Sequence, residues 1–168
     1  MTYTRGCGCL LTEFGGETTR WCDDHLVGAR ERGLLPGVPH PRLIRTAADA
    51  EIMARDWMHS MGYLDADVTP PGPDGGVDVD SSLAVAQVKA ETVPVGAPVV
   101  QALAGIAAAR QKTPLFFALC GYTKAASTFA EQAGVALFSF DYGGGIVPDN
   151  DLGRMMLPAE WDRVPAAH

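Results

Sequence analysis

Apolar residues recur at helical spacing soon after the first quarter of the chain. The stripe consists of Ala50, Met53, Ala54, Trp57, Met58 and Met61, and Gly62 ends it. Thr46 marks the start of this predicted helix, because its hydroxyl can cap the first turn and Asp49 can cap it in return. Glu51 lies beside the apolar stripe, near the predicted helix N-terminus.

Alternating strands and helices are predicted for the segment that follows. Short runs rich in β-branched and aromatic residues indicate strands, and apolar residues at every third or fourth position indicate helices. In chain order we expect strands at 66–69, 77–80 and 84–91, a helix from residue 96, a strand at 115–120, a helix at 123–133 and a strand at 135–141. This order predicts an α/β fold with a central mixed sheet flanked by helices.

Two neighbouring predicted strands carry the polar residues of greatest interest. Because side chains alternate along a strand, Asp78 shares a face with Asp80, and Gln87 shares a face with Lys89. A loop at 81–84 would place Asp78 directly opposite Gln87, whereas a loop one residue longer or shorter would misalign them. The register between these strands is therefore a testable prediction.

An acid on one strand and Gln-x-Lys on the next can bind Mg²⁺ and activate a water molecule. Mg²⁺ prefers oxygen ligands, which the Asp78 carboxylate and the Gln87 amide oxygen would supply. Lys89 would lower the pKa of the attacking water or stabilise the negative charge that develops. The alternative interpretation of Lys89 is that it protects an exposed edge strand from pairing.

Length and composition indicate a folded chain with one core and room for a small module. The chain has 168 residues, of which 47% are hydrophobic and 20% charged, so a disordered tail is excluded. No apolar run is long enough to span a bilayer, and the N-terminus lacks the pattern of a signal peptide. We therefore expect a cytoplasmic location without membrane association.

Cysteine and histidine near the N-terminus predict a structural zinc site. Cys7 and Cys9 form one close pair, Cys22 and His25 form a second, and a predicted hairpin at 10–21 would bring the pairs together. Such a small segment needs the metal for much of its folding free energy. The alternatives are a chance cluster or a redox pair at Cys7 and Cys9.

The chain divides into four predicted parts. Residues 1–35 form the small zinc-ribbon-like module, and residues 36–45, with three prolines, form an extended linker. The main α/β domain covers residues 46–142. Residues 143–168 are expected to form a C-terminal tail, mostly loop, with one turn near 158–162.

Several short motifs together resemble the catalytic domain of Mrr-type restriction endonucleases, a branch of the PD-(D/E)xK nuclease superfamily. The resemblance covers about residues 47–141 and lies in AE at 50–51, GY at 62–63, DGGVD at 74–78, QVK at 87–89, VGAPVVQALAG at 95–105 and GYTKAA at 121–126. In this branch a Gln replaces the acid of the usual D/E-x-K, and QVK fits that variant.

The resemblance implies a DNA endonuclease that depends on Mg²⁺ or Mn²⁺. By motif, Asp78 would be the principal metal ligand, Gln87 the second-position residue and Lys89 the catalytic lysine. Glu51 would be the acid carried by the helix and a further metal ligand. Because one such site cuts one strand, a homodimer is expected.

The charge distribution limits where DNA would bind outside the cleft. The net charge of −7 argues against broad, non-specific nucleic-acid binding. Residues 1–46 hold six arginines against five acids, whereas residues 47–168 hold seven cations against fifteen acids. Additional DNA contacts are therefore expected from Arg20, Arg30 and Arg32 in the first part.

Two alternatives concern the helix at 123–133 and the protein as a whole. Lys124 and Thr123 either contact a DNA phosphate at the helix start or belong to the helix cap. As a whole, the protein is either an endonuclease or a non-catalytic zinc-containing module that binds DNA or protein and retains the nuclease fold. The acidic composition favours the module, and the intact catalytic set favours the endonuclease.

Overall fold

The computed structural model describes residues 2–4, 10–12, 18–20, 35–73 and 75–163. The first three ranges are the strands β1 (Thr2–Thr4), β2 (Leu10–Thr12) and β3 (Thr18–Arg20), which form an antiparallel sheet in that order. The antiparallel pairing of β2 with β3 agrees with the predicted hairpin. β1 is a strand that the sequence did not predict.

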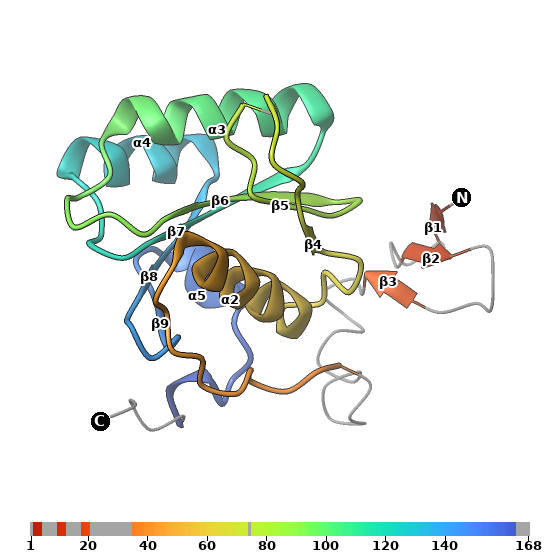
Figure 1. The fold of residues 1–168 in the computed structure, drawn as a ribbon. Coiled ribbons are helices and arrows are strands. Elements are labelled where there is room, and N and C mark those ends of the chain that lie inside the picture. Colours follow the sequence, from red (N-terminus) through yellow and green to blue (C-terminus); the bar gives the residue numbers. More distant parts are fainter. Residues whose placement is uncertain (1, 5–9, 13–17, 21–34, 74, 164–168) are drawn as a thin grey trace.

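A six-stranded mixed sheet forms the centre of the main domain (Figure 1). In spatial order its strands are β4 (Asp67–Val68), β5 (Val79–Asp80), β6 (Ala84–Lys89), β7 (Thr113–Ala118), β8 (Ala136–Phe140) and β9 (Ile146–Pro148). β6, β7 and β8 run parallel, and the remaining neighbours are antiparallel. The predicted α/β fold with a mixed sheet is confirmed.

Helices cover both faces of this sheet (Figure 1). α3 (Ala97–Arg110) and α4 (Lys124–Ala133) cover one face, and α2 (Ala47–Ser60) and α5 (Asp151–Met156) cover the other. The core is accordingly divided in two, with Phe116 of β7 packing on the α3 side and Phe117 on the α2 side. After Thr113, every residue of β7 is apolar and buried, as a strand covered on both faces requires.

The start of α2 follows the predicted capping box. The amide of Asp49 donates to the Thr46 hydroxyl at 3.1 Å, and the amide of Thr46 donates to the Asp49 carboxylate at 2.9 Å. These reciprocal bonds satisfy amide groups that the first helical turn leaves without partners. Because they fix where α2 begins, they also fix the turn on which Glu51 stands.

The register of β5 and β6 is the one predicted from the loop length. Val79 pairs with Ala86 and Asp80 pairs with Val85, so the same register continued by one position sets Asp78 opposite Gln87. The Ser81 hydroxyl accepts the amide of Ala84 at 2.9 Å and closes the turn between the two strands. The pairing of β5 with β6 aligns the two polar positions.

The C-terminal segment contains more regular structure than predicted. Instead of a loop with one turn, it contains strand β9, helix α5 and the short 3₁₀ helix η1 (Trp161–Arg163). β9 pairs with β8, and the Asn150 carboxamide caps α5 by accepting the amide of Gly153 at 2.9 Å. A three-residue strand ending in proline is too short for its side-chain alternation to be recognised in the sequence.

The strand predicted at 115–120 would include Cys120, and that boundary was wrong. β7 ends at Ala118, and Cys120 is exposed beyond it. The apolar run in the sequence continues past the point where the strand leaves the covered part of the sheet.

The segment predicted as a linker is joined to the turn between β8 and β9. The amide of Arg42 donates to the Gly143 carbonyl at 3.0 Å, and the amide of Ile44 donates to the Tyr142 carbonyl at 2.8 Å. A methyl group built on Gly144 would lie 2.8 Å from the Arg42 carbonyl oxygen, so the segment at Arg42 and the turn at Gly144 are in close contact. Across the ranges given above, no helix has the length and apolar character needed to cross a membrane.

Candidate active site

Asp78 lies just before β5 and is held against the backbone of β6. Its amide donates to the Ala86 carbonyl at 2.8 Å, and its carboxylate Oδ2 accepts the amide of Val88 at 2.7 Å. The carboxylate thus satisfies a β6 amide beyond the last residue that pairs with β5. Since Val88 stands between Gln87 and Lys89, this bond brings Asp78 to the predicted Gln-x-Lys motif.

Gln87 is a buried polar residue in β6, with 8% of its surface exposed. A methyl group built on Gly76 would lie 2.8 Å from Nε2 of Gln87, so the carboxamide lies directly against the Gly76 backbone. Gly76 has φ +89°, a left-handed conformation that favours glycine. A buried carboxamide normally has hydrogen-bond partners. Within the described ranges, the Gln87 carboxamide makes no hydrogen bond to another residue.

Glu51 and Asp78 line the same cavity, which has a volume of about 280 Å³. Burial raises the pKa of the Glu51 carboxyl above its ordinary value, and the nearby negative charge of Asp78 raises this pKa further. The other lining residues come from the segment after β4 and the segment before β5. Helix α2 and the segments after β4 and before β5 therefore bring two carboxylates together in one concave site.

Lys89 is the last residue of β6 and pairs with Ala118 of β7. Its ammonium Nζ lies 3.7 Å from the Glu91 carboxylate, and about a third of the side chain is exposed. β6 lies between β5 and β7, but β5 pairs only with Val85 and Ala86, so β6 is paired at Lys89 on the β7 side alone. Protection of an exposed strand edge therefore stays an alternative interpretation of this lysine. Side-chain alternation places Lys89 on the same face of β6 as Gln87.

The donor groups at this site fit a hard divalent cation. Glu51 and Asp78 would supply carboxylate oxygens from the cavity. Neither Gln87 nor Lys89 is among the residues that line the cavity, and the buried amide oxygen of Gln87 would have to contribute from the neighbouring strand β6. In the described part of the chain, no group of three or more His, Cys, Asp or Glu side chains forms a metal-binding cluster. A site here would combine two carboxylates with neutral ligands, as Mg²⁺ sites that retain several waters do.

Asp80 has a structural partner of its own. Its carboxylate lies 2.6 Å from Nζ of Lys112, which follows α3. This ion pair joins the end of β5 to the loop after α3.

The cap of α4 depends on Thr123, as one of the alternatives proposed. The Thr123 hydroxyl accepts the amide of Ala126 at 3.2 Å, and the exposed Lys124 is the first residue of the helix. Lys124 stays a predicted DNA contact.

The predicted zinc ligands and most of the predicted DNA-binding arginines lie outside the described residues. These are Cys7, Cys9, Cys22, His25, Arg30 and Arg32. Arg20 is the last residue of β3, and only its backbone is described.

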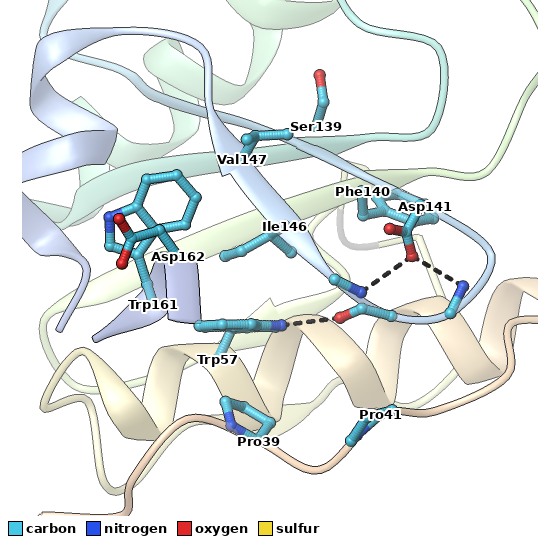
Figure 2. Close-up of a pocket in the computed structure, with 13 residues that line it drawn as sticks. Pro39, Pro41, Trp57, Ser139, Phe140, Asp141, Ile146, Val147, Trp161 and Asp162 are labelled. Carbon is cyan, nitrogen blue, oxygen red and sulfur yellow. Dashed lines mark hydrogen bonds between the residues drawn. The ribbon is translucent and has the colours of Figure 1, made fainter. Parts of the chain in front are cut away.

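A second cavity, of about 310 Å³, lies between α2, the β8–β9 turn and η1 (Figure 2). Trp57, Trp161 and two prolines of the incoming chain line it, and the indole N–H of Trp57 donates to the Gly144 carbonyl at 3.1 Å. None of the four predicted catalytic residues lines this cavity. We therefore treat it as separate from the site around Asp78.

The sequence interpretation missed two neighbours of the site, Thr69 and Gly76. Thr69 bonds to the backbone around Asp78 from the segment after β4, a pairing with no signature in the sequence. Gly76 had a signal in the Gly-Gly pair before Val77, but its contact with Gln87 depends on the sheet register.

Comparison with known proteins agrees with the geometry. The family model described as restriction endonuclease, the Mrr catalytic domain, matches residues 46–142. No curated protein and no solved structure was found to match the chain.

Proposed function

The chain belongs to the Mrr-type restriction endonuclease family, a nuclease family, and from this premise we propose that it is a metal-dependent endonuclease that hydrolyses phosphodiester bonds of DNA. One observation supports the proposal: the register of β5 and β6 sets Asp78 opposite Gln87, and the Asp78 carboxylate accepts the Val88 amide between Gln87 and Lys89. The intact set of acid, amide and lysine is the arrangement expected of such a site.

Asp78, Gln87 and Glu51 would hold Mg²⁺ or Mn²⁺ by their oxygens, and the bond from the Val88 amide orients the Asp78 carboxylate for that task. When bound, the ion would polarise the scissile phosphate and favour ionisation of the attacking water. The Lys89 ammonium would stabilise the negative charge that develops on the phosphate oxygens. The buried Gln87 is preorganised, because its carboxamide is held against Gly76.

The test is cleavage of supercoiled, linear and branched DNA in the presence of Mg²⁺ or Mn²⁺. We expect Lys89→Ala to lower the cleavage rate by about 100-fold or more, since it removes preorganised charge at the reacting phosphate. Arg110→Ala is the matched control, because it removes an exposed cation at the end of α3 and should cleave like the wild type.

Cleavage that survives in Lys89→Ala would contradict the proposed site. A nicked circle that accumulates before the linear product would indicate two separate strand cuts. Appearance of the linear product without a nicked intermediate would favour the proposed homodimer.

For the N-terminal module we propose a structural zinc ion held by Cys7, Cys9, Cys22 and His25. The spacing of the two pairs and the antiparallel pairing of β2 with β3 support it. Arg20, Arg30 and Arg32 would then orient the module on DNA. Zinc content well below one equivalent per chain in freshly purified protein would contradict the proposal.

The second candidate function is a non-catalytic binding module that retains the nuclease fold. The net charge of −7 favours it, because an acidic surface repels phosphate outside the cleft. Absence of cleavage on every substrate, together with absence of divalent-ion binding, would support this alternative.

A further inference from the structure

The backbone at Asp78 is bonded to β6 on one side and to Thr69 on the other. The amide of Thr69 donates to the Asp78 carbonyl at 2.9 Å. The Thr69 hydroxyl donates to the carbonyl of the preceding residue, Val77, at 2.6 Å. Thr69 thus bonds the carbonyl before the Asp78 Cα and the carbonyl after it. The Asp78 side chain is attached at that Cα, between the two bonds.

The hydroxyl bond is the part that depends on the identity of the residue. Any residue except proline can supply the amide, whereas only Ser or Thr places a hydroxyl at that point. Val77 is buried, with 1% of its surface exposed, so its carbonyl has little access to water if the hydroxyl is removed. Pro70 follows Thr69 and favours an extended backbone there.

Thr69 also lies at the cavity itself. It lines the same 280 Å³ cavity as Glu51 and Asp78. A shift of the Val77–Asp78 peptide would move the Asp78 carboxylate relative to Gln87, whose own position is limited by Gly76. Mg²⁺ tolerates little departure from octahedral geometry, so such a shift would weaken the binding of the ion.

We propose that Thr69 is a positioning residue, whose hydroxyl holds the Val77 carbonyl and thereby aims the Asp78 carboxylate at the divalent-cation site. This inference rests on the proposed function. It differs from a general stabilising role because it assigns the effect of the hydroxyl to metal affinity.

The test compares Thr69→Val, Thr69→Ser and Ser81→Ala in the full chain. Ser81 is the control, because its buried hydroxyl bonds the backbone at the opposite end of β5. Binding of Mn²⁺ without DNA is measured by calorimetry, and cleavage is measured separately. Thr69→Val should weaken Mn²⁺ binding by about 10-fold or more, as is typical when a group that orients a metal ligand is lost.

Thr69→Ser should restore Mn²⁺ affinity to within a few-fold of the wild type, and Ser81→Ala should bind Mn²⁺ normally even if its melting temperature falls. Folding of each variant is checked by circular dichroism. Wild-type affinity in a folded Thr69→Val variant would overturn the positioning role alone, as would an equal loss of affinity in Ser81→Ala. A wild-type protein that binds no divalent ion would overturn the proposed function, and the positioning role with it.

Discussion

Single side chains at the site combine properties that stability alone would not select. Gln87 is buried without a recorded partner in the described ranges, Glu51 shares a cavity with Asp78, and Gly76 has a left-handed backbone. The buried carboxamide and the two neighbouring carboxylates are costly to the folded state in the absence of an ion. Together they indicate that the site is arranged for a ligand, which is a common reason for unfavourable local structure.

Glu51 allows a pH-dependent test of whether the site lowers the stability of the metal-free protein. Its carboxyl has a raised pKa in the folded protein, so the folded state binds a proton more tightly than the unfolded state does. The free energy of unfolding therefore falls as the pH rises from the ordinary carboxyl pKa of the unfolded chain through the raised pKa of the folded protein. Above the raised pKa, this loss of stability stays constant. With a chelator present, Glu51→Gln should melt slightly higher than the wild type at pH 7 to 8.

The difference in melting temperature should disappear at a pH below the ordinary carboxyl range, where both side chains are neutral. Glu131→Gln, an exposed position on α4, is the control and should show no comparable gain. The same Glu51→Gln change should weaken Mn²⁺ binding. A variant that is less stable than the wild type at neutral pH without metal would contradict the interpretation of Glu51.

Residue-level prediction from sequence succeeded where local rules determine the outcome. The Thr46–Asp49 capping box and the Thr123 cap depend on neighbours three residues apart, and the structure has both. Thr69 could not be predicted, because its hydroxyl bonds a residue eight positions away across two strands. Cys120 was misplaced because apolar character does not show where a strand ends.

Among the secondary-structure elements, two glycines in helices have opposite surroundings. Gly153 in α5 is buried, and a methyl group built on it would lie 2.7 Å from the Leu137 carbonyl of β8. Gly105 in α3 is exposed, and a methyl group there would meet nothing within 4 Å. Close contact of α5 with the sheet therefore requires glycine, whereas α3 would accept alanine.

Gly153→Ala should destabilise the protein by about 1–3 kcal/mol, because α5 must move away from β8. Gly105→Ala should stabilise it by about 1 kcal/mol, since alanine is the better helix former. Urea denaturation of both variants measures the two changes. A stabilising effect of Gly153→Ala would mean that α5 does not rest on β8 as described.

Elements with long, periodic patterns were predicted more accurately than short ones. α2, α3 and the parallel strands β6, β7 and β8 lie where helical spacing and apolar runs placed them. β9 and α5 were missed, because three and six residues are too few to establish a period. Both are held mainly by contacts with β8.

For the whole molecule, the family match at residues 46–142 is shorter than the folded unit. β9 closes the β8 edge of the sheet, and the backbone at Arg42 and Ile44 bonds to the turn before β9. A fragment limited to the matched residues would lose all of these contacts. An open strand edge of this kind favours aggregation.

We therefore expect residues 35–163 to fold with a cooperative thermal transition, and residues 46–142 to aggregate. Thermal unfolding followed by circular dichroism, with light scattering on the same samples, distinguishes the two fragments. A soluble, cooperatively folding 46–142 fragment would contradict the importance of the C-terminal elements. Failure of the 35–163 fragment would show that residues 1–34 belong to the same folding unit.

The cavity in Figure 2 has a further consequence for the way the domain can be joined to other proteins. Pro39 and Pro41 of the incoming chain line it together with Trp161 and Asp162 of the outgoing chain, so the main domain begins and finishes at one corner. A domain with adjacent ends can be inserted into a surface loop of a host protein without separating the two halves of that host. This fold is therefore suited to transfer as a unit between proteins, with its sheet and the site around Asp78 intact.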